Sequence, residues 1–507
     1  MGGVGVGDAG RAGAALATPL VLALDVGTSS TRAMIFDARG LAVPGLVAQT
    51  PVALTLTPDG RVEGDAEALF GVAVGVIDEV LKSAGALANE IKAVGISCFW
   101  HSLMAVGPDA HALTPVYSWA DDRSAAAVDA LRGELDEGAI HDRTGCVIHT
   151  SYWPAKLRWL AGAQPDLFRG TTRWIGYGEY LLSRLTGSAA CSVAMASGTG
   201  LLDQHEADWD APLLAHLGLA RESLPELCDR DDALPPLRAE WATRWPALAE
   251  AKWFPSVGDG ACNNVGSGCV TPGLVALSVG TSGVMRVIVH QPDVVIPPKL
   301  WCYRLDRERF ILGGALSNGG VVADWLRGAL HLPDDAAARV ATLPPDGHGL
   351  TILPFWAGQR TPDWNPRSTA TIAGLTLETE PLAILRAGLE AVGQRFALVH
   401  ELLRPLATDP YEIVISGGAL GHWPVWPQII ADSLGHPLVA SAEPEASARG
   451  AAIIALLGIG AIERLEAAPV ALGRRYEPDA RAHAIYTKAR ARLERLHDLL
   501  HGATDER

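Results

Sequence analysis

The sequence has little positive charge, no cysteine-pair motif and no long apolar run. Its 507 residues carry 41 Lys and Arg against 57 Asp and Glu, a formal net charge of -16. This balance excludes the basic surface that nucleic acids and anionic membranes require. No uncharged apolar stretch reaches the roughly 18 residues of a membrane span, and residues 1–18 contain Asp8 and Arg11 where a secretory signal would have an apolar core. We expect a cytoplasmic protein with a small-molecule partner and a disordered tail at residues 1–18.

The cysteines exclude two further kinds of protein. They are odd in number, widely scattered and never spaced as CxxC, so they indicate neither a disulfide framework nor a structural zinc site. We expect reduced, mostly buried thiols at positions 98, 146, 191, 228, 262, 269 and 302.

The length is too great for one hydrophobic core and predicts two domains. Strand-like runs at 21–26, 32–37 and 92–97 alternate with helical patterns such as 65–83, which Asp65 would cap, and this alternation favours α/β domains. Residues 478–501 predict a charged amphipathic helix. We divide the chain into a tail and three parts, at 1–18, 19–264, 265–460 and 461–507, the last a helical extension.

One short motif occurs twice, half a chain apart. Residues 23–29 read ALDVGTS and residues 276–282 read ALSVGTS, identical at six of seven positions. Each copy predicts a β-hairpin with a Gly-Thr-Ser tip, whose backbone N–H groups and hydroxyls can cradle phosphate oxygens. An ordinary tight turn would explain one copy. Two copies at domain spacing favour a duplicated phosphate-binding domain.

The two copies differ at one position, where the first has Asp25 and the second has Ser278. A carboxylate beside phosphates would be repelled unless a cation lay between them. Asp25 therefore predicts Mg²⁺, held directly or through water.

Further motifs follow the hairpins in a fixed order. Residues 313–320 read GGALSNGG and are followed by Asp324, and residues 416–419 read SGGA and are followed by His422. Each glycine cluster alone is also explained by a tight strand-to-helix turn. Together, with the two hairpins, they make residues 20 to about 460 resemble the FGGY carbohydrate kinase family.

This resemblance implies a fold, cofactors and binding residues. The fold would be two duplicated actin-like ATPase domains of the ribonuclease H-like α/β class, with a cleft between them, and the cofactors would be ATP and Mg²⁺. Metal ligands would be Asp25 and Asp259. By the same resemblance, the nucleotide would contact Thr28, Ser29, Ser30, Arg32, Gly280, Thr281, Gly320, Asp324, Gly417, Gly418 and His422.

Asp259 is the candidate catalytic residue. The segment 256–262, SVGDGAC, sets one carboxylate between glycines near the predicted domain boundary, and the family's catalytic aspartate occupies this place. An Asp-Gly turn is the alternative explanation of the segment alone. With an ordinary pKa of about 4, Asp259 would be ionised at neutral pH and able to accept a proton from a substrate hydroxyl.

Sugar recognition is expected from the first domain. Trp100 and His101 follow the strand at 92–97, and ligands bind at the carboxyl ends of strands in α/β folds. Asp121 and Arg123 lie in a segment resembling the family's Trp-x-Asp-x-Arg element, although they are equally consistent with a structural ion pair. We expect Trp100, His101, Asp121, Arg123, Asp259 and Gly260 to bind the substrate.

Several motifs resemble the gluconokinases of this family, among them residues 360–366, RTPDWNP. This resemblance implies phosphorylation of D-gluconate to 6-phospho-D-gluconate. A sugar acid needs a cation for its carboxylate, and Arg123, Lys156 and Arg360 are all candidates.

Two alternatives stay open at this point. The substrate could be xylulose or another ketose or polyol, or the chain could be an ATP-driven binding protein like actin or Hsp70. A nicotinamide-dependent enzyme is excluded, because residues 3–7 have neither the spacing nor the preceding strand of a GxGxxG fingerprint. The sequence leaves the oligomeric state open, a homodimer included.

Overall fold

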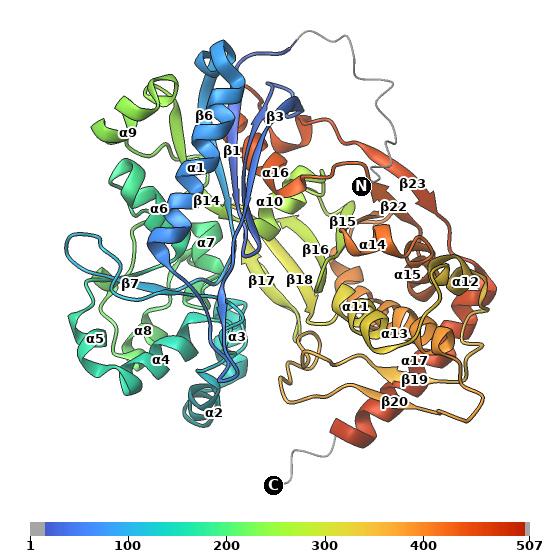
Figure 1. Ribbon diagram of the computed structural model, residues 1–507. Coiled ribbons are helices and arrows are strands. Elements are labelled where there is room, and N and C mark those ends of the chain that lie inside the picture. Colours follow the sequence, from blue (N-terminus) through green and yellow to red (C-terminus); the bar gives the residue numbers. More distant parts are fainter. Residues whose placement is uncertain (1–15, 502–507) are drawn as a thin grey trace.

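The computed structural model of the protein describes residues 16–501. Of the tail expected at 1–18, residues 1–15 lie outside this range, and the backbone oxygen of Ala17 accepts a hydrogen bond from the Ala38 N–H. The chain forms two halves, each built around one sheet (Figure 1).

The sheet of the first half is mixed, and its central strand β1 is buried along its whole length. Strand β1 pairs with β2 in an antiparallel hairpin and with β6 in parallel. A strand covered on both faces reads as an apolar run, which explains the sequence LVLALDV. The order is β14, β6, β1, β2 and β3, at Lys252–Gly258, Ile91–Cys98, Leu20–Val26, Ser30–Phe36 and Ala42–Pro51.

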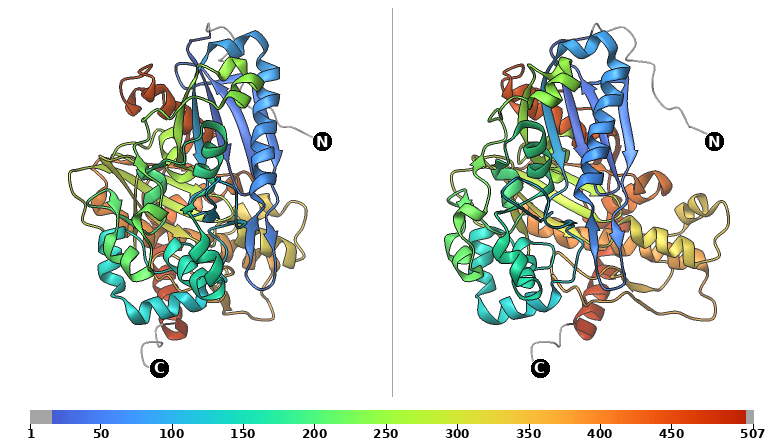
Figure 2. Two further views of the ribbon diagram at one scale, coloured as in Figure 1. Left: turned by 90° about the vertical axis from the view of Figure 1, so that its left-hand side faces the viewer. Right: turned by 60° about the vertical axis from the view of Figure 1, so that its left-hand side comes forward.

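Helices cover both faces of this sheet. Helix α1 (Ala66–Ala84) begins after Asp65, whose side chain accepts a hydrogen bond from the Ala68 N–H, as an N-cap does. Figures 1 and 2 show α1 on one face and α10 (Asp259–Gly266) with α16 (Ala446–Gly458) on the other.

In sequence, helix α16 lies between strands that belong to the second sheet, yet its side chains join the core of the first half. A Cβ atom at Gly450 would lie 1.9 Å from the Cys262 backbone oxygen of α10. Only glycine allows the two helices to approach this closely. The first half is therefore completed by a distant part of the chain.

The second sheet repeats the pattern of the first. Strand β15 pairs with β16 in an antiparallel hairpin and with β21 in parallel. The order is β17, β18, β16, β15, β21, β22 and β23, at Trp301–Arg304, Arg309–Leu316, Gly283–His290, Leu274–Val279, Glu412–Ser416, Leu438–Ser441 and Leu472–Tyr476.

The remaining elements are shorter or lie outside the two sheets. Helices of the first half are α2 to α9, at Ala125–Glu134, Glu137–Thr144, Trp153–Ala163, Pro165–Gly170, Tyr177–Thr186, Val193–Ser197, Ala211–Leu217 and Ala239–Arg244. Helices of the second half are α11 to α15 and α17, at Gly320–Ala329, Ala336–Thr342, Pro381–Leu403, Ala419–His422, Trp426–Leu434 and Ala480–His501. Minor strands are β4, β5, β7 to β13, β19 and β20, at Thr55–Leu56, Val62–Gly64, Met104–Val106, Val116–Tyr117, Arg173–Ile175, Cys191–Ser192, Leu202–Asp203, Asp208–Trp209, Leu227–Cys228, Thr351–Leu353 and Thr371–Ala373.

The element predictions are confirmed. The strands expected at 21–26, 32–37 and 92–97 are β1, β2 and β6, the helix expected at 65–83 is α1, and the terminal helix is α17. Both Gly-Thr-Ser hairpins are present. All seven cysteines are free thiols, six of them buried. Within residues 16–501, no helix has both the length and the apolar character to span a bilayer.

Candidate functional site

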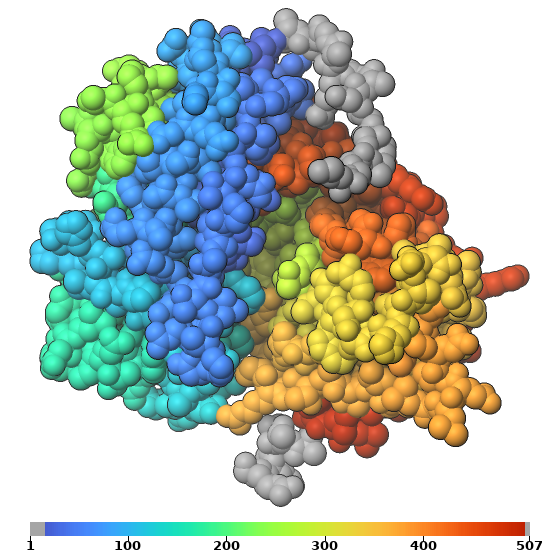
Figure 3. All heavy atoms as spheres, in the orientation of Figure 1, coloured from blue at the N-terminus to red at the C-terminus, as the bar shows by residue number. Residues whose placement is uncertain are grey.

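A cleft of about 560 Å³ lies between the two halves, and both hairpin tips line it. Figure 3 shows a hollow between the first half, in blue, and the second half, in yellow and orange. Thr28 and Ser29 contribute from the first tip, and Gly280 and Thr281 from the second. The duplicated motif therefore brings two sets of hydroxyl and N–H groups to one space.

The first hairpin carries a buried carboxylate. The Ser97 hydroxyl donates to Asp25 Oδ1 at 2.7 Å, and Arg32 Nη1 lies 3.6 Å from Asp25 Oδ2. Burial raises the pKa of Asp25, while Ser97 and Arg32 oppose that rise. Arg32 also lies 3.4 Å from Glu445 Oε2. Asp25, Ser30 and Arg32 lie behind the tip and do not line the cleft itself.

The second hairpin is surrounded by bare backbone. The Gly320 N–H donates to the Gly280 oxygen at 2.7 Å. Gly417 has φ 119°, and a Cβ atom there would lie 2.2 Å from the Val279 oxygen, whereas a Cβ atom at Gly418 would meet open space. Glycine is required at 417 by both conformation and contact. These glycines extend an open surface away from the Gly280 tip.

Two predicted nucleotide residues lie on helices beside this surface. Asp324 of α11 pairs with Arg327 at 3.1 Å and is exposed. His422 ends α14, which begins directly after Gly418, and it is exposed too. Neither lines the cleft.

Asp259 begins α10 at the carboxyl end of β14 and lines the cleft. Its Oδ1 accepts a hydrogen bond from the Gly260 N–H at 2.8 Å. Burial raises the pKa of Asp259 to about 6, and the charge of Asp25 adds to this rise. Two carboxylates that are each disfavoured as anions fit a hard divalent cation, which would stabilise both charges.

His101 and Trp100 line the cleft on the first half. His101 has φ 68°, a conformation that is strained for a residue with a Cβ and is common at functional sites. Its Nδ1 is hydrogen-bonded to the Gly198 oxygen. Because a carbonyl oxygen only accepts, Nδ1 carries the proton and Nε2 is left as an acceptor. Burial lowers the pKa of His101 to about 3, so the ring is neutral at pH 7.

Tyrosines complete this wall of the cleft. The hydroxyls of Tyr152 and Tyr303 are 2.7 Å apart, and both rings pack edge-on against His101. Tyr303 comes from β17 of the second half, so both halves build the wall. An aromatic surface with a few hydrogen-bonding groups suits a polyhydroxylated ligand.

Asp121 and Arg123 do not reach the cleft. Arg123 Nη2 lies 2.6 Å from Asp121 Oδ2 and 2.7 Å from Glu63 Oε2. Asp121 also accepts a hydrogen bond from the Val62 N–H. The structure thus supports the ion-pair explanation of these two residues, while Trp119 of the same segment does line the cleft.

Arg286 lines the cleft and was not expected from the sequence. It projects from β16, where its Nη2 donates to Asn263 Oδ1 at 2.8 Å, and its buried Nε has no hydrogen-bond partner in the described part of the chain. Burial lowers the pKa of Arg286 to about 10, against the attraction of Asp259. A lone arginine in the apolar strand GVMRVIVH was the one sequence signal for it.

A second carboxylate and histidine cluster lies elsewhere, in the second half. Glu390 pairs with Arg386 and His348 and accepts a hydrogen bond from the Tyr486 hydroxyl, and Asp346 pairs with Arg492. Its acceptors are already satisfied by protein donors, so this cluster secures α17.

Comparison with known proteins agrees with this geometry. The N-terminal domain of the "FGGY family of carbohydrate kinases" matches residues 20–266, and its C-terminal domain matches residues 275–459. A gluconokinase of Bacillus subtilis (strain 168) is 27% identical over 90% of this chain and 91% of its own.

Two solved structures from Lactobacillus acidophilus resemble the whole molecule. A gluconate kinase superimposes with a TM-score of 0.89 at 27% identity, covering 96% of this chain and 98% of its own. A ligand-bound xylulose kinase superimposes with a TM-score of 0.89 at 27% identity, covering 96% of this chain and 99% of its own. The predicted fold class, two actin-like α/β domains, is confirmed. The chain belongs to the FGGY family of carbohydrate kinases.

Proposed function

We propose that this carbohydrate kinase transfers the γ-phosphoryl group of ATP to the terminal hydroxyl of a sugar acid, converting D-gluconate to 6-phospho-D-gluconate. The observation that carries the proposal is the position of Asp259. It is a half-buried carboxylate with a pKa of about 6, in a cleft lined by both Gly-Thr-Ser tips and by the aromatic wall. The similarity to gluconokinases supports the choice of substrate.

Asp259 would act as the general base. A substrate hydroxyl oxygen forms a bond to the γ-phosphorus as the bond between that phosphorus and the leaving oxygen of ADP breaks, and the hydroxyl proton passes to Asp259. Before a cation binds, a pKa near 6 leaves Asp259 ionised at pH 7 and a better proton acceptor than an ordinary carboxylate.

The remaining groups have separate tasks. Asp25 and Asp259 would hold Mg²⁺, which when bound supplies positive charge to the phosphate oxygens. The hairpin tips donate N–H groups and hydroxyls to those oxygens, and the glycine surface around Gly418 leaves room for the nucleotide base. Arg286, which lies beside Asp259 and has a free Nε, would add charge at the transferred phosphoryl group.

A neutral ketose such as xylulose is the second candidate substrate. It is supported by the xylulose kinase structure, whose similarity to this chain equals that of the gluconate kinase structure. The alternative of an ATP-driven binding protein is disfavoured by the combination of Asp259 with an aromatic, hydrogen-bonding cleft.

A substrate panel tests the proposal. ADP release is measured with D-gluconate, D-xylulose and glycerol, each with and without Mg²⁺. We expect Mg²⁺-dependent release that gluconate stimulates most. Stimulation by xylulose alone would replace gluconate with a ketose, and ATP hydrolysis unaffected by any sugar would favour the binding protein.

A further inference from the structure

The cleft contains two arginines, and their neighbours divide it into two ends. Arg286 lies at the end of Asp259 and Asn263, near the proposed site of phosphoryl transfer. Arg360 lies at the other end, with its Cζ 5.2 Å from the centroid of the Trp119 ring. It interacts electrostatically with Tyr152 and Tyr303. One arginine thus serves the phosphoryl end, and the other has no task in the transfer itself.

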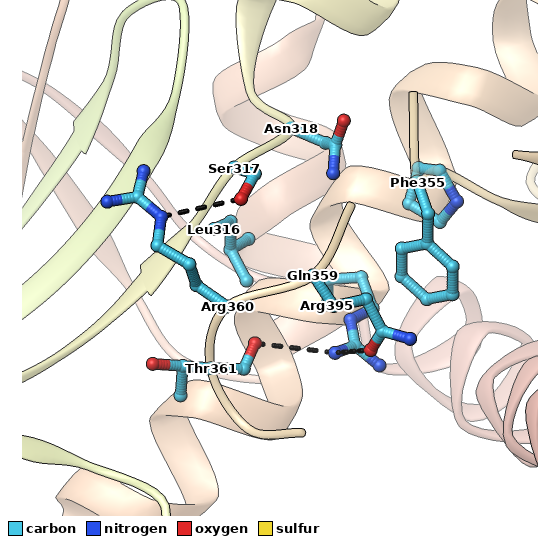
Figure 4. Close-up of a pocket in the computed structure, with 9 residues that line it drawn as sticks. Leu316, Ser317, Asn318, Phe355, Gln359, Arg360, Thr361 and Arg395 are labelled. Atoms are coloured by element: carbon cyan, nitrogen blue, oxygen red, sulfur yellow. Dashed lines mark hydrogen bonds between the residues drawn. The ribbon is translucent and has the colours of Figure 1, made fainter. Parts of the chain in front are cut away.

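Arg360 has almost no partner for its charge. It forms no ion pair with any carboxylate of residues 16–501, and its one hydrogen bond is from Nε to the Ser317 hydroxyl at 3.4 Å. Figure 4 shows this contact and shows the end of the guanidinium turned away from Gln359 and Arg395. Both terminal nitrogens therefore remain free to donate to a ligand.

The surroundings of Arg360 offer no compensating negative charge. Burial lowers the pKa of Arg360 and lowers the pKa of His149 to about 3, so this histidine is neutral. Burial raises the pKa values of Tyr152 and Tyr303 well above their usual range, so both hydroxyls stay protonated. A half-buried charge such as that of Arg360 is unfavourable without a counter-ion. A neutral sugar would leave the positive charge of Arg360 uncompensated, whereas an anionic ligand would neutralise it.

The other two cations considered from the sequence are already engaged. Arg123 pairs with Asp121 and Glu63 outside the cleft. Lys156 donates to the Thr150 oxygen, and its burial lowers its pKa to about 7. Neither lines the cleft. Of the three, only Arg360 is available to a substrate.

We propose that Arg360 binds the carboxylate of the substrate and thereby selects sugar acids over neutral sugars. This inference rests on the proposed kinase activity and assigns its specificity to one side chain. The planar guanidinium matches a carboxylate through two parallel N–H···O bonds, and Trp119 holds the plane of the guanidinium from one side. The chain of the sugar would then extend from Arg360 toward Asp259.

The test compares D-gluconate with D-gluconamide, in which a neutral carboxamide replaces the carboxylate. The kcat/KM of the wild-type enzyme should be about 100-fold higher for gluconate. In Arg360→Gln, this ratio should fall toward one, mainly through a higher KM for gluconate. Arg360→Lys keeps the charge without the paired geometry and should give an intermediate ratio.

Two arginine variants serve as controls. Arg367 belongs to the same loop but is exposed and pairs with Asp129 on the surface, so Arg367→Gln should leave both substrates unaffected. Arg286→Gln should lower kcat for both substrates alike and leave their ratio unchanged. The pattern expected of Arg360 is therefore distinct from general damage and from loss of phosphoryl transfer.

The failures are distinguishable. Equal losses for gluconate and gluconamide in Arg360→Gln, or equal wild-type rates for the two, would overturn the role of Arg360 while leaving the kinase proposal intact. A wild-type enzyme that phosphorylates xylulose and neither gluconate nor its amide would overturn both proposals. The wild-type ratio requires no variant, so a ratio near one overturns the role of Arg360 even if a substitution at 360 prevents folding, and Arg360→Lys then tests the side chain with its charge kept.

Discussion

The two hairpins differ mainly in one pair of side chains, of which one lies on the first hairpin strand and the other on the parallel strand next to it. In the first half, Asp25 of β1 is paired with Ser97 of β6, and their side chains are hydrogen-bonded. In the second half, Ser278 of β15 is paired with Ser416 of β21, and their hydroxyls are 2.9 Å apart. The same two positions therefore hold a carboxylate with a hydroxyl in one half and two hydroxyls in the other.

The chain then diverges directly after these paired serines. Ser97 is followed within four residues by Trp100 and His101, which line the cleft. Ser416 is followed by Gly417 and Gly418, which leave bare backbone. The same place in a repeated frame thus carries an aromatic wall in one half and an open surface in the other. This difference supports our proposal that the sugar and the metal charge belong to the first half and the nucleotide to the second.

The largest effect is expected from the carboxylate that only the first half supplies to the substrate. Asp259→Asn removes the proton acceptor and keeps the shape, so kcat should fall by about 1000-fold. The affinity for ADP, measured by calorimetry, should change less than threefold, because the proposed nucleotide surface lies in the second half. A comparable loss of ADP affinity would contradict this division.

The next effect tests the difference between the hairpins directly. Asp25→Ser makes the first hairpin like the second and should lower kcat by about 100-fold while raising the Mg²⁺ concentration needed for half-maximal rate. Ser278→Ala changes the matching position and should cost less than tenfold. If both variants lose activity equally, the carboxylate has no special role.

A smaller effect is expected at the nucleotide surface. Gly418 has ordinary helical dihedrals and open space beside it, so Gly418→Val should fold normally. It should weaken ADP binding by about tenfold through steric overlap. Gly75→Val, at an exposed glycine of α1 that also faces open space, is the matched control and should bind ADP normally. Unchanged binding in Gly418→Val would remove the nucleotide from this surface.

The smallest effect concerns stability and two neutral histidines, His101 of the aromatic wall and His149, which lies outside the cleft lining. His101 and His149 have pKa values of about 3 in the folded chain, well below the value of about 6.5 in an unfolded chain. Between these values the unfolded chain binds more protons, so stability is lost as pH falls below about 6.5. Each histidine contributes up to about 1.4 kcal/mol per pH unit. Denaturant unfolding of His149→Gln between pH 7 and 5 should show a shallower slope than the wild type, and identical slopes would contradict the buried neutral state.

Local motifs made much of this molecule predictable. The hairpins, β6, α1 and α17 follow from apolar periodicity and turn residues. Trp100 and His101 follow from their place at a strand end, and Asp259 from its flanking glycines and the family resemblance. Each depends on a few neighbouring residues. The sequence pattern was sufficient wherever local structure alone decides where a side chain lies.

Long-range pairing decided the rest. Tyr303 reaches the cleft because β17 pairs with β18 beyond β16. Helix α16 packs in the core of the first half although it lies between strands of the second sheet in sequence. Arg123 pairs with Glu63, 60 residues away, and with Asp121, so neither Asp121 nor Arg123 lines the cleft. That Arg360 lacks a counter-ion is known only from the three-dimensional positions of the carboxylates around it.

The most direct test of the central claim is mass spectrometry of the product. The wild-type protein is incubated with ATP, Mg²⁺ and D-gluconate, and Asp259→Asn is treated in parallel. The account predicts gluconate carrying one phosphoryl group on its terminal hydroxyl with the wild type and almost none with the variant. ADP formed without phosphorylated gluconate, or equal product from both proteins, would contradict it.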